Sequence, residues 1–408
     1  ISEGGHLLLD PKNITVGTGV TSQNWVYRGL IGHDYEAATT NNVNEANLIT
    51  ADNFGTDVTI SDDATLMAVG ARKGDGFSDA STDSGEVYLY KFDDGDFTNA
   101  TLIGRIGKGY TGNNDLDISS LTKADKFGRS VSFDSTGSRL VVGATGDDGN
   151  PNNNDNNNVT NAGAVYLITF TDSNGNPSTN FENPAHVGTI GAGYTGSKNV
   201  DLSKQGFNKA PVIEESDLFG VSVALDGDAD VLAVGVYGDD GYDEKGSGTA
   251  NTIADSGSVF MISFDDSDFT GGKVVSRIGN GYTQDEGYAD STCYTNAACA
   301  SFTNDFNTRD HTDLIQDNKD RFGWSTTLNH DGSLLAVGRI NDDGKNNNIN
   351  NVGAVNLFKF MDAGSIVSAA TGKATYVGTI GYGYDYLDTS DSIAVSYTHL
   401  RAHETVRN

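Results

Sequence analysis

Cysteine and proline are scarce in this chain of 408 residues, which holds two cysteines and five prolines. Cys293 and Cys299 lie in one insert without a histidine beside them, so their spacing does not indicate a zinc site. We interpret the pair as a local disulfide of an oxidising compartment, with two free thiols as the alternative.

Basic residues and long apolar runs are also lacking. Lys and Arg number 26 against 56 Asp and Glu, which gives a net charge of -30. Such a surface repels phosphate backbones and anionic lipid headgroups, so we expect no nucleic-acid partner. No segment approaches the roughly 20 consecutive apolar residues of a membrane helix, so we expect no membrane insertion. The 51 glycines favour many short strands joined by tight turns.

An internal repeat organises the chain. The pattern Asp-x-Phe-Gly occurs at 52–55, 125–128, 217–220 and 320–323, and each copy precedes four β-type runs. In the third copy these runs are 219–225, 231–236, 257–264 and 274–279. The second run has apolar or small residues on both faces, which is typical of a strand buried on both sides. Four antiparallel strands per repeat predict an all-β fold, a β-propeller with four full four-stranded blades at about 52–112, 125–196, 217–283 and 320–384.

The two ends of the chain depart from the repeat. Residues 25–32 align with 375–381 as an orphan last strand, which places the propeller at 21–395. Residues 5–16 resemble a stretch of filamentous-haemagglutinin-like secreted exoproteins, so 1–20 are expected to end a preceding β-rich, β-helix-like segment. Residues 396–408 are rich in His and Arg and are interpreted as a non-native tail. Because the chain opens on Ile1, we expect a fragment or a processed product.

The repeat resembles the FG-GAP repeat, the blade also found in the head of integrin α-subunits. In the second copy Phe127-Gly128 matches the FG and 142–144 the GA, with the third strand at 164–167. The proline of GAP is absent in every copy, and Arg72, Thr145, Tyr237 and Ile340 stand at or near its place, which fits a bacterial-type variant. The resemblance implies an extracellular adhesion or partner-binding propeller, calcium in some blades, and six or seven blades in a closed ring. Four blades and an orphan strand therefore predict part of a larger propeller, with a smaller closed ring as the alternative.

Calcium candidates are the closely spaced carboxylates, because this cation takes six to eight oxygen ligands. They are Asp226, Asp228 and Asp230 in one turn, and the Asp-Asp-Gly pairs Asp147 and Asp148, Asp239 and Asp240, and Asp342 and Asp343. Turn formation and hydrogen bonding explain the same residues without an ion and are the favoured interpretation. The leading Asp of each Asp-x-Phe-Gly is expected to accept backbone N–H groups and tie one blade to the next.

Two further expectations concern contacts between blades. Phe219 and Gly220 are predicted to pack one blade against another. Each fourth strand runs into Gly-x-Gly-Tyr, as at 107–110 and 191–194, and the tyrosine is predicted to pack on an adjacent unit.

Catalytic motifs are weak, since the chain has no His-Glu-x-x-His and no phosphate-binding Gly-rich loop. His186 and His330 have no counterparts in the other copies. We predict a non-enzymatic, secreted or cell-surface binding module of an adhesin-like protein, presenting the loops after Val236 and Ile278 to an extracellular protein or glycan. A calcium-stiffened structural spacer in a large exoprotein is the alternative. A propeller hydrolase would require an arginine triad with a paired acid in the channel.

Overall fold

The computed structural model describes residues 27–35, 42–150, 159–202, 213–241, 253–282, 304–311, 314, 319–345, 347 and 349–384. Blade 1 holds β3 (Phe54–Ile60), β4 (Leu66–Ala71), β5 (Glu86–Lys91), β6 (Thr101–Gly107) and β7 (Leu116–Asp117). Blade 2 holds β8 (Phe127–Phe133), β9 (Arg139–Ala144), β10 (Ala164–Thr169), β11 (Ala185–Gly191) and β12 (Val200–Asp201). Blade 3 holds β13 (Ser222–Leu225), β14 (Val231–Val236), β15 (Ser258–Ser263), β16 (Lys273–Gly279) and β17 (Phe306–Asn307). Blade 4 holds β18 (Phe322–Leu328), β19 (Leu334–Arg339), β20 (Ala354–Asp362), β21 (Ser365–Ile366) and β22 (Lys373–Gly381).

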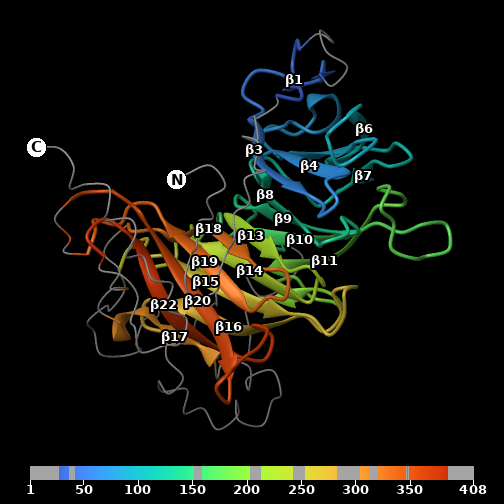
Figure 1. Cartoon of the computed structure of the whole chain (residues 1–408). Helices are drawn as coiled ribbons and strands as arrows, with labels where there is room; N and C mark the ends of the chain where they lie inside the picture. Colours follow the sequence, from blue (N-terminus) through green and yellow to red (C-terminus); the bar gives the residue numbers. More distant parts are fainter. Residues whose placement is uncertain are drawn as a thin grey trace, which may run out of the picture.

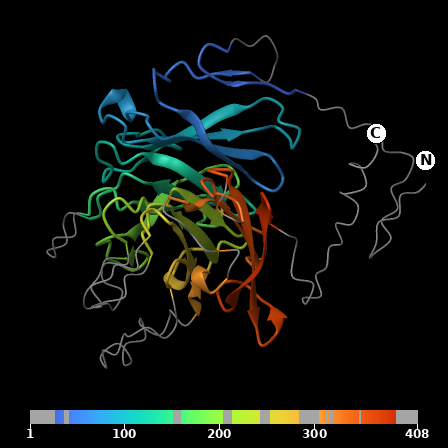
Figure 2. The ribbon, with the colours of Figure 1, turned by 90° about the vertical axis from the view of Figure 1, so that its left-hand side faces the viewer.

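The four sheets are arranged as successive blades around a common inner side (Figure 1; Figure 2). The first strands β3, β8, β13 and β18 lie beside one another, and the later strands of each blade lie farther out. Within each blade the four long strands pair antiparallel in chain order. The described residues form no α-helix, only the short 3-10 helices Phe77–Asp79 and Thr308–Asp310. The all-β, propeller-type fold predicted from the repeat is confirmed.

Each of the first three blades has a fifth strand that the sequence reasoning assigned to a loop. Strands β7, β12 and β17 pair parallel with β6, β11 and β16, so these blades have five strands and not four. The same pairing joins β1 (Ile31–Gly32) to β2 (Val43–Asn44) before blade 1. The orphan strand is therefore the outer edge of a blade-like unit. Two residues are too few for an alternating pattern, which explains why these strands were missed.

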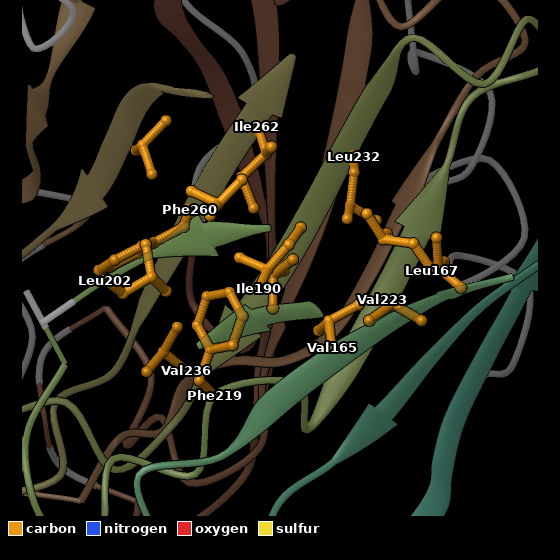
Figure 3. Close-up of a cluster of buried hydrophobic side chains, with 14 of the residues drawn as sticks. Val165, Leu167, Ile190, Leu202, Phe219, Val223, Leu232, Val236, Phe260 and Ile262 are labelled. Carbon is orange, nitrogen blue, oxygen red and sulfur yellow. The ribbon is translucent and has the colours of Figure 1, made fainter. Parts of the chain in front are cut away.

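The hydrophobic core consists of layers between blades. Along β14, Leu232 and Val234 face blade 2, whereas Val231 and Ala233 face blade 4. The prediction that the second strand of the third copy is buried on both faces is confirmed. Figure 3 shows the layer between blades 2 and 3, where Phe219 meets the side chains of both blades.

Glycine allows the backbones of neighbouring blades to touch. The amide of Phe219 donates to the Ala162 carbonyl at 2.7 Å, and Gly163 forms a parallel bridge with Phe219. A methyl group placed on Gly143 would lie 2.0 Å from the Gly220 carbonyl oxygen, so only glycine fits there. Equivalent contacts recur between blades 1 and 2 and between blades 3 and 4. Phe219 and Gly220 thus pack blade against blade, as predicted.

Several expectations fall outside the described residues. These are the haemagglutinin-like stretch 5–16, the pair Cys293 and Cys299, and the tail 396–408. No helix in the described part of the chain is long and apolar enough to cross a membrane.

Candidate functional site

The repeat places its motifs at one end of the blades. Because the strands alternate in direction, the starts of the first and third strands lie at the same end of each blade as the ends of the second and fourth strands. Asp-x-Phe-Gly, Asp-Asp-Gly and Gly-x-Gly-Tyr therefore lie together at what we call the motif end. The turn 226–230 and its counterparts lie at the opposite end. The predicted calcium residues are thus divided between the two ends of the propeller.

The first carboxylate of Asp-Asp-Gly is buried and satisfied by donors from its own blade. Asp147 accepts hydrogen bonds from the hydroxyls of Tyr166 and Tyr194, at 2.7 and 2.8 Å, and from the Gly149 amide at 2.8 Å. Burial raises the pKa of Asp147, and the tyrosine hydroxyls oppose that rise. The side chain of Asp147 is therefore a structural acceptor, whose oxygens are already held by donors.

Blades 3 and 4 repeat this arrangement. Asp239 accepts from the hydroxyls of Ser258 and Tyr282, both at 2.7 Å, and from the Gly241 amide at 2.5 Å. Asp342 accepts from the Tyr384 hydroxyl at 3.0 Å and also pairs with Arg339. In blades 2, 3 and 4 the hydroxyl of the Gly-x-Gly-Tyr tyrosine thus donates to a buried carboxylate that follows the second strand of its own blade. The ring of Tyr282 also belongs to the hydrophobic layer between blades 2 and 3, and that of Tyr194 packs against the layer between blades 1 and 2, which agrees with the prediction that this tyrosine packs toward an adjacent unit.

The second carboxylate of each pair closes the following loop. Asp148, Asp240 and Asp343 accept from the amides of Asn161, Asp255 and Asn351 at 2.8, 2.8 and 2.6 Å. Within the described residues no three His, Cys, Asp or Glu side chains are grouped so as to hold a metal ion. A calcium ion would have to displace these donors, so the Asp-Asp-Gly residues do not fit a calcium site. Their geometry matches the hydrogen-bonding interpretation.

The turn with Asp226, Asp228 and Asp230 is held by its own first residue. The Asp226 carboxylate accepts from the amides of Asp230 and Val231, each at 3.0 Å, while Asp228 is exposed. Burial, together with the charge of Asp230, raises the pKa of Asp226 to about 7. The three carboxylates do not converge on one point, so this turn does not fit calcium either.

Replacing Asp226 by asparagine should flatten the dependence of stability on pH. An acid whose pKa is raised by folding binds more protons in the folded state, so its ionisation costs stability as pH rises from about 4 through about 7. The melting temperature of the unmodified protein should therefore fall between pH 5 and pH 8, and that of Asp226→Asn should fall less. Asp228→Asn changes the same charge at an exposed position and should keep the original slope. If calorimetry gives the same dependence of melting temperature on pH for all three proteins, the raised pKa of Asp226 is refuted.

The leading Asp of Asp-x-Phe-Gly accepts a backbone amide, as predicted, but from the connection before it. Asp52, Asp125 and Asp217 each accept from the amide three residues earlier, at 2.6 Å. Their carbonyls accept amides that follow the second strand of the same blade. The contact between blades comes from the backbone of the Phe-Gly pair and not from this Asp side chain.

A cluster of basic and aromatic side chains that the sequence reasoning missed lies at the motif end. We call it the rim cluster, and it consists of Arg72, Arg129, Tyr237, Arg321 and Trp324. Arg72 and Tyr237 directly follow β4 and β14, and Arg321 directly precedes β18. Arg129 and Trp324 are the third residues of β8 and β18. All four blades therefore contribute to one cluster near the inner strands.

The rings of the rim cluster hold its guanidinium groups. Tyr237 and Trp324 lie 5.1 Å apart between ring centroids. The Arg321 Cζ lies 5.2 Å from the Tyr237 centroid and 5.8 Å from that of Trp324. The Arg129 Cζ lies 5.5 Å from the Trp324 centroid. These cation–π contacts hold Arg129 and Arg321 beside the rings and do not use up the N–H donors of their guanidinium groups.

The rim cluster concentrates positive charge in an acidic protein. Burial lowers the pKa of Arg129, and the positive charge of Arg72 lowers it further, while the negative charge of Asp57 opposes this shift. The buried Nε of Arg321 has no hydrogen-bond partner among the described residues. A bound anion would reduce the repulsion between the like charges and would accept a hydrogen bond from the unsatisfied donor. The cluster therefore has the chemistry of an anion-binding site.

Fold and repeat together define an all-β, propeller-type repeat domain built of blades. Within it, residues 49–90 and 121–168 match the FG-GAP repeat. Each match runs from before Asp-x-Phe-Gly into the third strand, so the resemblance seen in the sequence is confirmed for the first two copies. No comparison supports the haemagglutinin-like resemblance of residues 5–16.

The chain is also similar in fold to solved lactonase structures, at low identity. A periplasmic gluconolactonase of Pseudomonas aeruginosa shares 13% identity with a TM-score of 0.34, covering 83% of this chain and 59% of that one. A protein of Bacteroides uniformis with a provisional 6-phosphogluconolactonase description shares 9% identity with a TM-score of 0.34, covering 81% of this chain and 73% of that one. No curated protein matches the chain. The function must therefore be argued from this chain's own residues.

Proposed function

We propose that this protein is a non-enzymatic binding module whose rim cluster takes a carboxylate group of its ligand. The observation that carries the proposal is the convergence of three arginines and two aromatic rings from four blades, in a chain with a net charge of -30. Guanidinium groups bind carboxylates through paired N–H donors. Because the rest of the surface is acidic, a ligand with few negative charges fits better than a dense polyanion.

The surroundings of the rim cluster suit an extracellular partner. The loops after Val236 and Ile278, which the sequence points to as variable, leave the blades at the same motif end as the cluster. Partner-binding residues are commonly carried on such loops above a rigid scaffold. We propose a secreted or cell-surface, adhesin-like protein, with a protein or glycan as the source of the carboxylate.

A hydrolase fits the rim cluster less well. The acid whose charge acts on Arg129 is Asp57 of β3. Its two oxygens accept the amides of Val58 and Val131, at 3.0 and 2.8 Å, so they join blade 1 to blade 2. An acid engaged in this way is poorly placed to transfer a proton to a substrate. Binding without turnover is the better explanation of the three arginines.

Isothermal titration with digalacturonate, a short peptide with a single Glu side chain, and a neutral maltooligosaccharide tests the proposal. We expect binding of a carboxylate-bearing probe and none of the neutral one. The variant Arg129→Met/Arg321→Met should bind at least about tenfold more weakly, because hydrogen bonds between charged partners contribute about 1.5–3 kcal/mol. Whichever carboxylate probe binds identifies the source as glycan or protein.

The matched control is Arg28→Met. Arg28 is exposed, lies 3.6 Å from Asp96 and is not part of the rim cluster, so its loss should leave the affinity unchanged. Because Arg28→Met removes one positive charge and the double variant removes two, a loss of binding free energy in Arg28→Met that reaches half of that in the double variant would show that net charge alone causes the effect and would overturn the proposal. If no carboxylate probe binds while calcium raises the melting temperature, the structural spacer is the better function.

A further inference from the structure

Blade 4 exposes a sheet face whose counterparts in the other blades are buried. Its apolar side chains Leu334, Val355 and Ile380 are 44%, 38% and 61% exposed. The residues at the same register in blade 3, Val231, Val259 and Ile278, are fully buried against blade 4. In blade 1 the corresponding residues are Leu66, Val87 and Ile106, which are fully buried against blade 2.

The glycines of this face are also uncovered. A methyl group on Gly235 of blade 3 would lie 1.9 Å from the Gly323 carbonyl oxygen of blade 4. At the same register in blade 4, a methyl group on Gly338 would meet only the side chain and backbone of Ser325, in its own blade. Gly257 bridges Phe322 of the next blade, and Gly353, its counterpart, has a similar positive φ of 75°. Blade 4 therefore has the complete backbone seat for a Phe-Gly pair.

A serine in the first strand also takes part in the contact between blades. The hydroxyls of Ser130 and Ser222 each donate to the carbonyl of the next blade's Phe-Gly glycine, at 2.8 and 2.9 Å. Ser325 holds the same place in β18 and is exposed. Apolar side chains, glycines and serine on one face thus repeat every element of an interface between blades.

We propose that this outer face of blade 4 docks one further blade of the same repeat, with its Phe-Gly pair seated on Gly338 and Gly353. The recognition chemistry is specific: a Phe-Gly backbone that pairs with Gly353, a glycine carbonyl that accepts from Ser325, and apolar side chains that cover Val355 and Ile380. This interface is distinct from the rim cluster and does not depend on what the cluster binds.

A second copy of this chain fits the face less well. Within the described residues, the surface of a second copy that matches is the face of blade 1 that carries Phe54 and Gly55, where Val58 and Ile60 are 56% and 47% exposed. The pair β1 and β2 already packs beside that face, at the place that the fourth and fifth strands of a preceding blade occupy. If a second copy docked there, the β22 strand of one copy would collide with β1 of the other. A blade with a free Phe-Gly face has no such obstacle.

Cysteine labelling of the face tests the proposal. In a Cys293→Ser/Cys299→Ser background, Ile380→Cys should react rapidly with a maleimide in the present chain. Appending a copy of residues 213–311 that carries the same two Cys→Ser substitutions after residue 384 as a fifth blade should slow this reaction at least about tenfold, because a buried side chain reacts only on opening. Ile366→Cys, an exposed residue in β21, is the control that should react equally in both proteins.

A second variant separates docking from misfolding of the appended blade. Gly338→Ala should have little effect on the present chain but should restore rapid labelling of Ile380→Cys when the fifth blade is present. Unchanged rapid labelling without Gly338→Ala, in an extended protein whose fifth blade shows native amide protection, would overturn the proposal. Concentration-dependent protection in the unextended chain, with a dimer in light scattering, would also overturn it and assign the face to a second copy.

Discussion

Replacing Gly235 by alanine is expected to separate blade 4 from blade 3. The added methyl group would lie 1.9 Å from the carbonyl oxygen of Gly323, a backbone atom held by its own blade. Overpacking that cannot be relieved by side-chain rotation costs about 3 kcal/mol, at the upper end of the usual range. Because each blade is stabilised by its neighbours, the loss should fall on one interface and split thermal unfolding into two transitions in calorimetry.

The matched control is the same substitution at Gly338. Both glycines follow a valine in the second strand and approach a serine of their own first strand, but only Gly235 faces another blade. Gly338→Ala should cost less than about 1 kcal/mol, because the serine hydroxyl can rotate away. Hydrogen exchange should show faster opening of β18 and β19 in Gly235→Ala only. Similar losses in both variants would mean that the substitution acts within the blade and not between blades.

The sequence predicted the parts of the fold that repeat over long strands. The second strand of blade 3 was predicted at 231–236 and lies there, because apolar side chains on both faces mark a strand between two layers. The first strand was predicted at 219–225, but its continuous ladder begins at Ser222, after Gly220, whose φ of 86° is the conformation that Gly128 takes at the register shift inside β8. Local backbone conformation of this kind is not encoded in apolar alternation.

The sequence does contain a signal for the fifth strands, but the periodicity of apolar residues does not detect it. An apolar residue between two Asp or Asn residues occurs at 42–44, 115–117, 199–201 and 305–307. The second acidic or amide side chain accepts the amide of the second glycine in Gly-x-Gly, as Asp117 does from Gly109 at 2.7 Å. This short motif becomes visible when the copies are aligned on Gly-x-Gly-Tyr, because it follows that tyrosine in each of the first three blades.

The candidate site was less predictable, because each blade contributes only one or two residues to it. Arg72 and Tyr237 were noted as departures from the proline of GAP, but nothing in the sequence places them beside Arg129 or Trp324. Only the inner strands of consecutive blades bring these residues together. The Asp-Asp-Gly carboxylates repeat visibly in the sequence, yet their partners are tyrosines 19 to 47 residues away. The repeated carboxylate pair therefore has one hydrogen-bonding role that blades 2, 3 and 4 share.

Replacing Asp305 by alanine is expected to destabilise blade 3 by about 3–5 kcal/mol, the usual cost of leaving one member of a buried ion pair alone. Asp305 accepts from the Nη2 of Arg277 at 2.6 Å and from its backbone amide at 2.8 Å, and both side chains are buried. The guanidinium also lies 4.4 Å from the ring of Tyr282, whose hydroxyl donates to Asp239. The variant thus removes the anchor of the fifth strand and leaves a cation buried in the same blade.

Two further variants distinguish the lost pair from lost packing. Asp265→Ala breaks an exposed pair with Lys273, 3.8 Å apart in the same blade, and should cost at most about 1 kcal/mol. Arg277→Met/Asp305→Leu removes both charges, and because no buried cation is left unpaired it should recover most of the stability lost in Asp305→Ala. Chemical denaturation followed by tyrosine fluorescence gives the three free energies of unfolding. If the double variant is as unstable as Asp305→Ala, the strand depends on the hydrogen bond to the Arg277 amide and not on the charge that Asp305 balances.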